Sequence, residues 1–321
     1  MIFSKFIEKA YRSNVFARND ADGSVFYFSA SDFEGLRAEP FSFLNSRGDS
    51  LNGNYYYYDG YRPDRLVIFD HGMGAGHRAY MKEIEMLARH GFKVFSYDHT
   101  GCSSSEGAGI RGLSGSLADL DDCIKAIKAE GVYSGNDISV VGHSWGGFST
   151  MNVAAYHPDL HSLVAISGFI SLPEMHKQLF AGPMALFRKT LLQVERAENG
   201  SYADTSAAES LRASRIPALI IHSEDDKTVS SKKHHHPLKE ALSDVPTVEF
   251  ILVDGKDHNP NYTAEAVKEK DIFFAALKKK KKAGELSTDE QKAAFVASFD
   301  WNKITEQDEN LWQKILAHLD K

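Results

Sequence analysis

The sequence predicts an α/β fold built on a mostly parallel sheet with helices on both faces. From Arg65 onward, short apolar runs alternate with segments whose apolar residues recur at helical spacing. Unbroken apolar runs indicate strands buried on both faces, and their alternation with helices is typical of a parallel sheet. We therefore expect reactive side chains to collect beyond the carboxyl ends of these strands.

The first 60 residues differ from the rest because they are polar and aromatic. Alternating patterns at 24–29 (SVFYFS) and 53–60 (GNYYYYDG) predict antiparallel strands, and 46–53 (SRGDSLNG) is rich in turn residues. The four successive tyrosines are interpreted as strand residues of a two-faced sheet rather than as a binding strip.

The parallel part of the sheet should contain six strands with helices between them. Strands are expected at 65–72, 92–98, 137–143, 160–168, 216–223 and 247–255. Helices are expected at 79–91, 116–131, 145–158, 230–242 and 264–278.

We expect a single domain over residues 1–321 with two additions to the sheet and its helices. Residues 169–211 separate two predicted core strands and have helical, apolar character, which fits either a surface crossover or a small helical cap over a pocket. Residues 284–321 should form a helical extension that packs back on the sheet. Its last helix buries one apolar face: Leu311, Trp312, Ile315 and Leu319.

Composition and charge exclude several classes of partner. Hydrophobic residues make up 42% of the chain, charged residues 25%, and the formal net charge is −7, which gives no reason to expect a nucleic acid partner. Charged residues interrupt the first 20 positions, unlike a secretory signal, and no apolar run approaches the roughly 20 residues of a membrane helix. Cys102 and Cys123 are expected to be free thiols. These features favour a cytoplasmic protein.

Segment 139–148 (SVVGHSWGGF) places Ser144 on a sharp turn between a predicted strand and a predicted helix. Gly142 and Gly146 stand two residues before and after it, where a side chain would crowd the turn. The helix amino terminus also favours developing negative charge beside the hydroxyl. Ser144 is therefore a candidate nucleophile, provided that a base and an acid follow it.

The acid and the base are expected after later strands, in that order. Glu224, Asp225 and Asp226 follow the strand at 216–223, and we favour Asp226 from its position before Val229. His258 follows the last predicted core strand and is the expected base.

The candidate oxyanion hole consists of two backbone N–H groups. One belongs to Trp145, and the other to Met73 in the glycine-rich segment 69–77 (FDHGMGAGH). That segment lacks the Gly-Lys-Ser/Thr ending of a phosphate-binding loop. The consecutive histidines at 234–236 point about 100° apart on a helix, so no metal site is expected there.

These blocks together resemble the α/β-hydrolase superfamily over residues 41–278. Besides the oxyanion segment and GHSWGG, the resemblance includes SYDHTGCSSSEG at 96–107, HSEDDKTVS at 222–230 and DGKDHN at 254–259. The most similar branch is the one that includes monoacylglycerol lipases, lysophospholipases and serine aminopeptidases. The resemblance implies a lipase-like serine hydrolase that needs no cofactor and carries a cap where residues 169–211 fall.

The expected activity is that of a carboxylesterase that cleaves esters of small to medium acyl chains through an acyl-enzyme, with Ser144, His258 and Asp226 as catalytic triad. The same residues would also serve amide or thioester hydrolysis or acyl transfer, and non-catalytic ligand binding is the alternative from another class. Apolar residues of the 169–211 segment are expected either to line the acyl pocket or to form the core of the cap: Phe169, Met175, Leu179, Phe180, Met184 and Phe187.

Overall fold

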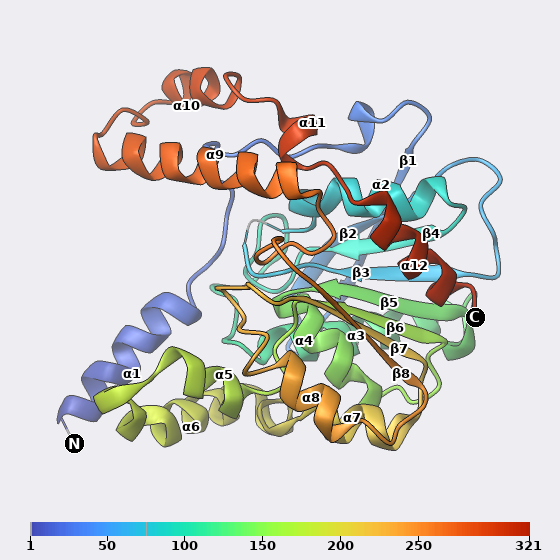
Figure 1. Cartoon of the computed structure of the whole chain (residues 1–321), viewed down its shortest axis with the longest axis horizontal. Helices are drawn as coiled ribbons and strands as arrows, with labels where there is room; N and C mark the ends of the chain where they lie inside the picture. Colours follow the sequence, from blue (N-terminus) through green and yellow to red (C-terminus); the bar gives the residue numbers. More distant parts are fainter. Residues whose placement is uncertain (1, 75) are drawn as a thin grey trace.

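A computed structural model describes residues 2–74 and 76–321 of the chain, in which an eight-stranded sheet is flanked by helices (Figure 1). The strands are β1 (Arg37–Leu44), β2 (Ser50–Tyr57), β3 (Leu66–Asp70), β4 (Lys93–Tyr97), β5 (Ile138–His143), β6 (Ser162–Ile166), β7 (Ala218–Ser223) and β8 (Val248–Val253).

The strand order is β1-β2-β4-β3-β5-β6-β7-β8. Strands β3 to β8 run parallel to their neighbours, whereas β1 pairs with β2 and β2 pairs with β4 in antiparallel fashion. The predicted fold class, a mostly parallel sheet with antiparallel first strands, is thus confirmed. Strand β5 lies between β3 and β6, so the loops that follow these three strands meet at one edge of the sheet.

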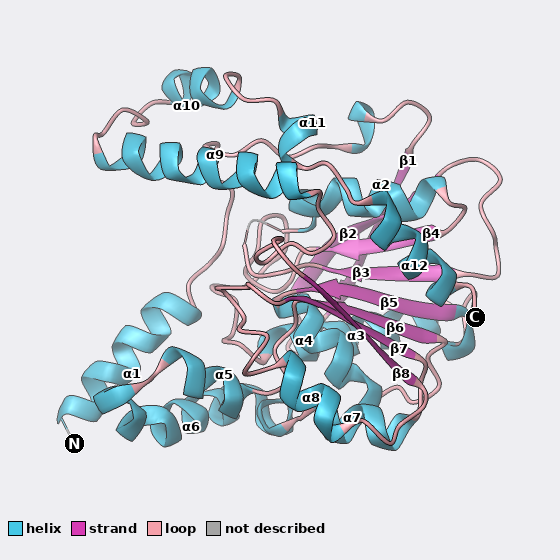
Figure 2. Cartoon of the chain, in the orientation of Figure 1, coloured by secondary structure: helices cyan, strands magenta, loops and turns pink. Residues whose placement is uncertain are grey.

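Helices cover both faces of the sheet (Figure 2). They are α1 (Ile2–Val15), α2 (Met81–Arg89), α3 (Gly115–Ala129), α4 (Trp145–Asn152), α5 (Leu172–Leu179), α6 (Arg188–Asn199), α7 (Ala207–Ser214), α8 (His235–Ala241), α9 (Ala264–Lys282), α10 (Asp289–Val296), α11 (Trp301–Ile304) and α12 (Glu309–Leu319). None of those within the described ranges combines the length and apolar composition of a membrane span.

Alternation along each buried strand divides the core into two layers. In β3, Leu66 and Ile68 belong to the apolar cluster that contains residues of α3, α4, α7 and α8. Val67 and Phe69 belong to the opposite cluster, together with residues of α2 and α12. The predicted apolar face of the last helix is buried in this second cluster.

The amino-terminal region differs from the expected pair of strands. Residues 2–15 form helix α1, and residues 24–29 form no strand. Most of the other expected strand, at 53–60, belongs to β2, which forms the antiparallel hairpin with β1. In the turn between them, the Asn45 side-chain oxygen accepts from the backbone N–H groups of Arg47 and Asp49. Phe26 in the extended segment packs against Trp301 of α11, with ring centroids 5.8 Å apart.

The 169–211 segment folds into α5, α6 and α7 and packs against α1 (Figure 1). A separate apolar cluster joins the two parts, with Ile7 and Tyr11 of α1 against Leu191 and Val194 of α6. Helix α1, which the sequence pattern did not predict, therefore buries much of the apolar surface of this segment.

The buried carboxylate of Glu195 accepts the hydrogen bonds that hold α1 and α6 together. Tyr11 donates a 2.6 Å hydrogen bond to Glu195 Oε1, the backbone N–H of Leu113 donates to the same oxygen at 2.9 Å, and the Ser114 hydroxyl donates to Oε2 at 2.9 Å. Burial raises the pKa of the Glu195 carboxyl, whereas these donors stabilise its charged form. The carboxylate thereby connects α1, α6 and the loop before α3.

Helices α9, α10 and α11 form a further small cluster next to the sheet, with Phe273, Leu277, Phe295 and Ile304 buried among them. Of the expected extension at 284–321, only α12 packs on the sheet, since α10 and α11 pack on α9 instead.

Replacing Glu195 by alanine should leave four buried donors without their acceptor: the Tyr11 and Ser114 hydroxyls and the backbone N–H groups of Leu113 and Ser114. We expect Glu195→Ala to lower the free energy of unfolding by about 3 kcal/mol, because each unsatisfied buried polar group is costly. Urea unfolding monitored by circular dichroism measures the change. The control is Gln193→Ala on the exposed side of α6, which should leave the unfolding midpoint close to that of the wild type. Equal midpoints for the two variants would contradict the anchoring role.

Candidate active site

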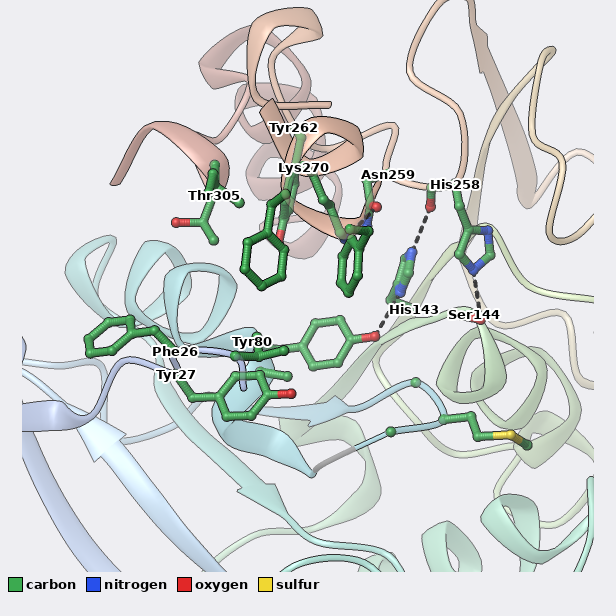
Figure 3. Close-up of a pocket in the computed structure, with 18 of the residues that line it drawn as sticks. Phe26, Tyr27, Tyr80, His143, Ser144, His258, Asn259, Tyr262, Lys270 and Thr305 are labelled. Atoms are coloured by element: carbon green, nitrogen blue, oxygen red, sulfur yellow. Dashed lines mark hydrogen bonds between the residues drawn. The ribbon is translucent and has the colours of Figure 1, made fainter. Parts of the chain in front are cut away.

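A cavity of about 520 Å³ lies at the carboxyl edge of the sheet (Figure 3). Its walls come from five parts of the chain that are distant in sequence. They are segment 25–27, the loop after β3, the turn between β5 and α4, the loop after β7, and the region from the loop after β8 through α9 and α11. Ser144 and His258 both line it. The aromatic members of the wall are Phe26, Tyr27, Tyr80, Tyr262, Phe273, Phe274 and Trp301.

Ser144 occupies the tight turn between β5 and α4, with φ 57° and ψ −112°. This backbone conformation is strained for a residue with a side chain, and it points to a site held in place by its surroundings. A Cβ atom at Gly146 would lie 2.0 Å from the carbonyl oxygen of Asp70, and one at Gly142 would lie 2.4 Å from that of Gly146. Both positions therefore require glycine because backbone approaches backbone there.

A continuous chain of hydrogen bonds connects the serine with a histidine and a carboxylate. His258 Nε2 lies 2.8 Å from Ser144 Oγ, and His258 Nδ1 lies 2.8 Å from Asp226 Oδ2. The imidazole is 18% exposed, whereas the Asp226 side chain is fully buried. The backbone N–H groups of Thr228 and Val229 each donate to Asp226 Oδ1 at 2.8 Å, which fixes the carboxylate in position.

The other two carboxylates of this loop have different partners. Asp225 Oδ1 accepts from the Ser223 hydroxyl at 2.6 Å and from the backbone N–H of Lys256 at 3.2 Å, so it ties the loop after β7 to the loop after β8. Glu224 is paired with His236 at 2.8 Å. Of the three candidates, Asp226 is the one that meets His258.

Asp226 is electrostatically suited to remain ionised. Burial alone would raise its pKa, but hydrogen bonds from His222 and His258 outweigh that effect and hold the pKa of Asp226 well below its usual range. Because the folded-state pKa is depressed, the stabilisation from this carboxylate is fully present above the ordinary value of about 3.9 and is lost as the pH falls through the folded value.

The His143 side chain contacts the backbone of the loop that carries His258 (Figure 3). Its Nε2 lies 2.8 Å from the carbonyl oxygen of His258, which can only accept, so Nε2 carries the proton and Nδ1 accepts from the Tyr80 hydroxyl at 2.9 Å. Burial lowers the pKa of His143, in keeping with a neutral ring. The sequence contains no signal for the pairing of His143 with Tyr80.

The expected oxyanion donors belong to the loop after β3 and to the first residue of α4. A Cβ atom at Gly72 would lie 3.3 Å from Ser144 Cβ, so the Gly72–Met73 backbone approaches the serine closely. Trp145 is the first residue of α4, where backbone N–H groups have no partner within the helix. The Trp145 indole is buried and donates to the Leu113 carbonyl oxygen at 2.6 Å, away from the cavity wall.

Known proteins share this architecture. A family model described as serine aminopeptidase, S33, matches residues 61–201. An esterase from Pyrococcus furiosus is 20% identical with a TM-score of 0.59, covering 84% of this chain and 96% of its own. The chain has the fold of the α/β-hydrolase superfamily. The family match and this fold support hydrolase activity.

Two further solved structures have the same fold at low sequence identity. A putative dienelactone hydrolase from Klebsiella pneumoniae is 16% identical with a TM-score of 0.55, covering 89% of this chain and 99% of its own. The esterase domain of a Rhodothermus marinus protein is 19% identical with a TM-score of 0.51, covering 70% of this chain and 90% of its own.

The apolar residues proposed for the acyl pocket of this hydrolase do not line the cavity. Phe169 stacks on Phe148 of α4, with ring centroids 4.4 Å apart, and Met175 is buried in the main core. Leu179 is exposed at the end of α5. The remaining three pack in the cluster with α1: Phe180, Met184 and Phe187.

The cavity walls that sequence reasoning missed belong to residues 25–27 and to α9 and α11. The adjacent aromatics Phe26–Tyr27 and Phe273–Phe274 were the available signal, but neither pair lies near Ser144 in sequence. Within the part of the chain that the structure describes, no group of three His, Cys, Asp or Glu side chains is arranged to hold a metal ion.

The contacts of Asp225 and Asp226 predict opposite outcomes for their amide variants. Asp226→Asn should slow the labelling of Ser144 by a fluorophosphonate probe roughly 10³- to 10⁴-fold, because the amide cannot stabilise a His258 imidazolium. Asp225→Asn should label at nearly the wild-type rate. Labelling rates from in-gel fluorescence, with folding checked by thermal denaturation, make the comparison. Slower labelling of Asp225→Asn than of Asp226→Asn would reverse the assignment.

Proposed function

We propose that this protein is a serine esterase that hydrolyses carboxylic esters of small to medium acyl chains through an acyl-enzyme. The observation that carries the proposal is the hydrogen-bonded chain from Ser144 through His258 to buried Asp226, with the serine open to the cavity. A serine hydroxyl attacks a carbonyl only when a base removes its proton, and that base needs an orienting carboxylate.

In the first half-reaction, Ser144 Oγ attacks the ester carbonyl while its proton passes to His258 Nε2. Asp226 stabilises the resulting imidazolium across the 2.8 Å contact with Nδ1. Backbone N–H groups of Met73 and Trp145 stabilise the oxyanion of the tetrahedral intermediate. The imidazolium then protonates the leaving alcohol, and the acyl group remains on Ser144.

In the second half-reaction, His258 removes a proton from water, and the resulting hydroxide attacks the acyl carbonyl. A second tetrahedral intermediate collapses, the acid leaves, and the proton returns to Ser144 Oγ. The strained backbone at Ser144 and the hydrogen bond of His143 to the His258 carbonyl oxygen support the same alignment in both half-reactions.

The composition of the cavity favours an ester over a peptide amino terminus. An aminopeptidase must accommodate the cationic α-amino group of its substrate, for which a carboxylate is the ordinary partner. Among the described residues that line the cavity there is no Asp or Glu, and the charged member is Lys270. Like charges would disfavour a peptide amino terminus there.

Removal of the nucleophile tests the proposal directly. We expect Ser144→Ala to reduce kcat for hydrolysis of 4-nitrophenyl butyrate by roughly 10⁴- to 10⁶-fold while the fold is retained. Absorbance at 400 nm follows turnover, and thermal denaturation checks the fold. Wild-type turnover that survives in a folded Ser144→Ala protein would rule out Ser144 as the nucleophile.

The position of the cavity predicts which apolar side chains set acyl-chain preference. Phe274 of α9 lines the cavity, whereas Leu186 of the 169–211 segment is 84% exposed and lies outside it. Phe274→Ala should lower kcat/KM for 4-nitrophenyl hexanoate by roughly tenfold relative to the acetate, since it removes apolar contact area.

The matched control is Leu186→Ala, which should leave the hexanoate-to-acetate ratio at its wild-type value. If Leu186→Ala changes this ratio and Phe274→Ala does not, the acyl chain binds under the 169–211 segment instead.

A further inference from the structure

The cavity beside Ser144 contains a cation that the proposed mechanism does not use. Lys270 of α9 is the one Lys, Arg, Asp or Glu among the cavity-lining residues that the structure describes. Its Nζ donates a 2.7 Å hydrogen bond to Asn259 Oδ1, next to His258 in sequence (Figure 3). An ammonium group has three N–H donors, so this contact leaves donor capacity toward the cavity.

Lys270 has no direct counter-ion in the part of the chain that the structure describes. No carboxylate oxygen of the described residues lies within 4.0 Å of Nζ. The Tyr262 ring provides a cation–π contact at 5.0 Å. An apolar, aromatic environment is a poor substitute for water around an ammonium group, so a bound anion would be strongly favoured there.

Glu83 is the carboxylate with the largest electrostatic effect on Lys270, but it does not line the cavity. It is buried, and its Oε1 accepts a 3.0 Å hydrogen bond from Asn261. Burial lowers the pKa of Lys270, with Glu83 acting in the opposite direction, and burial also raises the pKa of Glu83. Glu83 thus helps to keep the lysine charged without occupying its place in the cavity.

We propose that Lys270 determines specificity by binding a carboxylate carried by the substrate, so that the preferred substrates are esters with an aromatic or apolar body and a free carboxylate remote from the scissile bond. This inference rests on the proposed esterase function and adds the chemical class of its substrate. The aromatic walls supply contact area for the body, and the ammonium group supplies a charge-assisted hydrogen bond to the anion.

Matched pairs of esters test the preference on either side of the scissile bond. One pair is 4-acetoxybenzoate and 4-isopropylphenyl acetate, and the other is the 4-nitrophenyl monoester of adipic acid and 4-nitrophenyl 6-methylheptanoate. In each pair an isopropyl group replaces the carboxylate at similar volume. For at least one pair, Lys270→Met should lower kcat/KM of the anionic ester by about tenfold or more, mainly through KM, and leave its neutral partner nearly unaffected.

Two variants control for charge and for helix position. Lys270→Arg should recover much of the selectivity because it keeps the cation. Lys268→Met, at an exposed position of α9 outside the cavity, should behave as wild type toward every ester. If Lys270→Met lowers kcat for anionic and neutral esters equally, the lysine positions the His258 loop through Asn259, and the specificity proposal is overturned.

Binding to an inactive protein separates this inference from the esterase proposal. Calorimetry with Ser144→Ala should show 4-isopropylbenzoate binding about tenfold tighter than 4-isopropylbenzamide, and Lys270→Met in that background should abolish the difference. Equal affinities would overturn the inference even if neutral esters are hydrolysed. Carboxylate selectivity without turnover of any ester would instead refute the esterase proposal and retain the anion site.

Discussion

Contact of backbone with backbone around Gly142, Gly146 and Gly147 is the constraint on which the rest of the site depends. A side chain at Gly146 would collide with the Asp70 carbonyl oxygen at 2.0 Å, and one at Gly147 would lie 2.9 Å from the Cα of Gly168. The loops after β3, β5 and β6 therefore meet without intervening side chains. Ser144 is held at positive φ by this packing, and its hydroxyl is presented at the edge of the sheet where the loops after β7 and β8 bring Asp226 and His258.

A buried polar layer beneath the turn supports the same arrangement. His99 lies 3.2 Å from Asp70 Oδ1 and 3.4 Å from Asp119 Oδ2, and its ring packs on the Trp145 indole with centroids 4.9 Å apart. Burial opposes its protonation, but the two carboxylates outweigh burial and raise the pKa of His99 to about 9. A cation thus stabilises two buried carboxylates between β3, β4 and α3, directly below the first residue of α4. The buried charges of His99, Asp70 and Asp119 are thus paired, whereas the ammonium group of Lys270 at the cavity has no ionic partner among the residues that the structure describes.

The sequence was sufficient to predict those features of the site that depend on local residue pattern and on the order of motifs along the chain. The glycines around Ser144 indicate a sharp turn between a strand and a helix. The order of serine, acid and histidine in the chain follows from their places after successive parallel strands. The position of Asp226 before Val229 also agrees with its contact to His258. The cavity walls could not be predicted, because they depend on which distant segments fill space over the sheet edge. The 169–211 segment has the composition of a cap, but α1 covers much of its apolar surface, while residues 25–27, α9 and α11 line the cavity.

The central claim is that Ser144 carries the acyl group during turnover, and a trapped intermediate tests it most directly. Rapid acid quench of the wild-type protein during hydrolysis of a slowly deacylated 4-nitrophenyl ester, followed by intact-mass and peptide mass spectrometry, would locate the acyl group. The account predicts one acyl mass per chain, assigned to the peptide that contains Ser144, and its absence from Ser144→Ala. Acyl transfer to a different residue at a rate that supports turnover would contradict it.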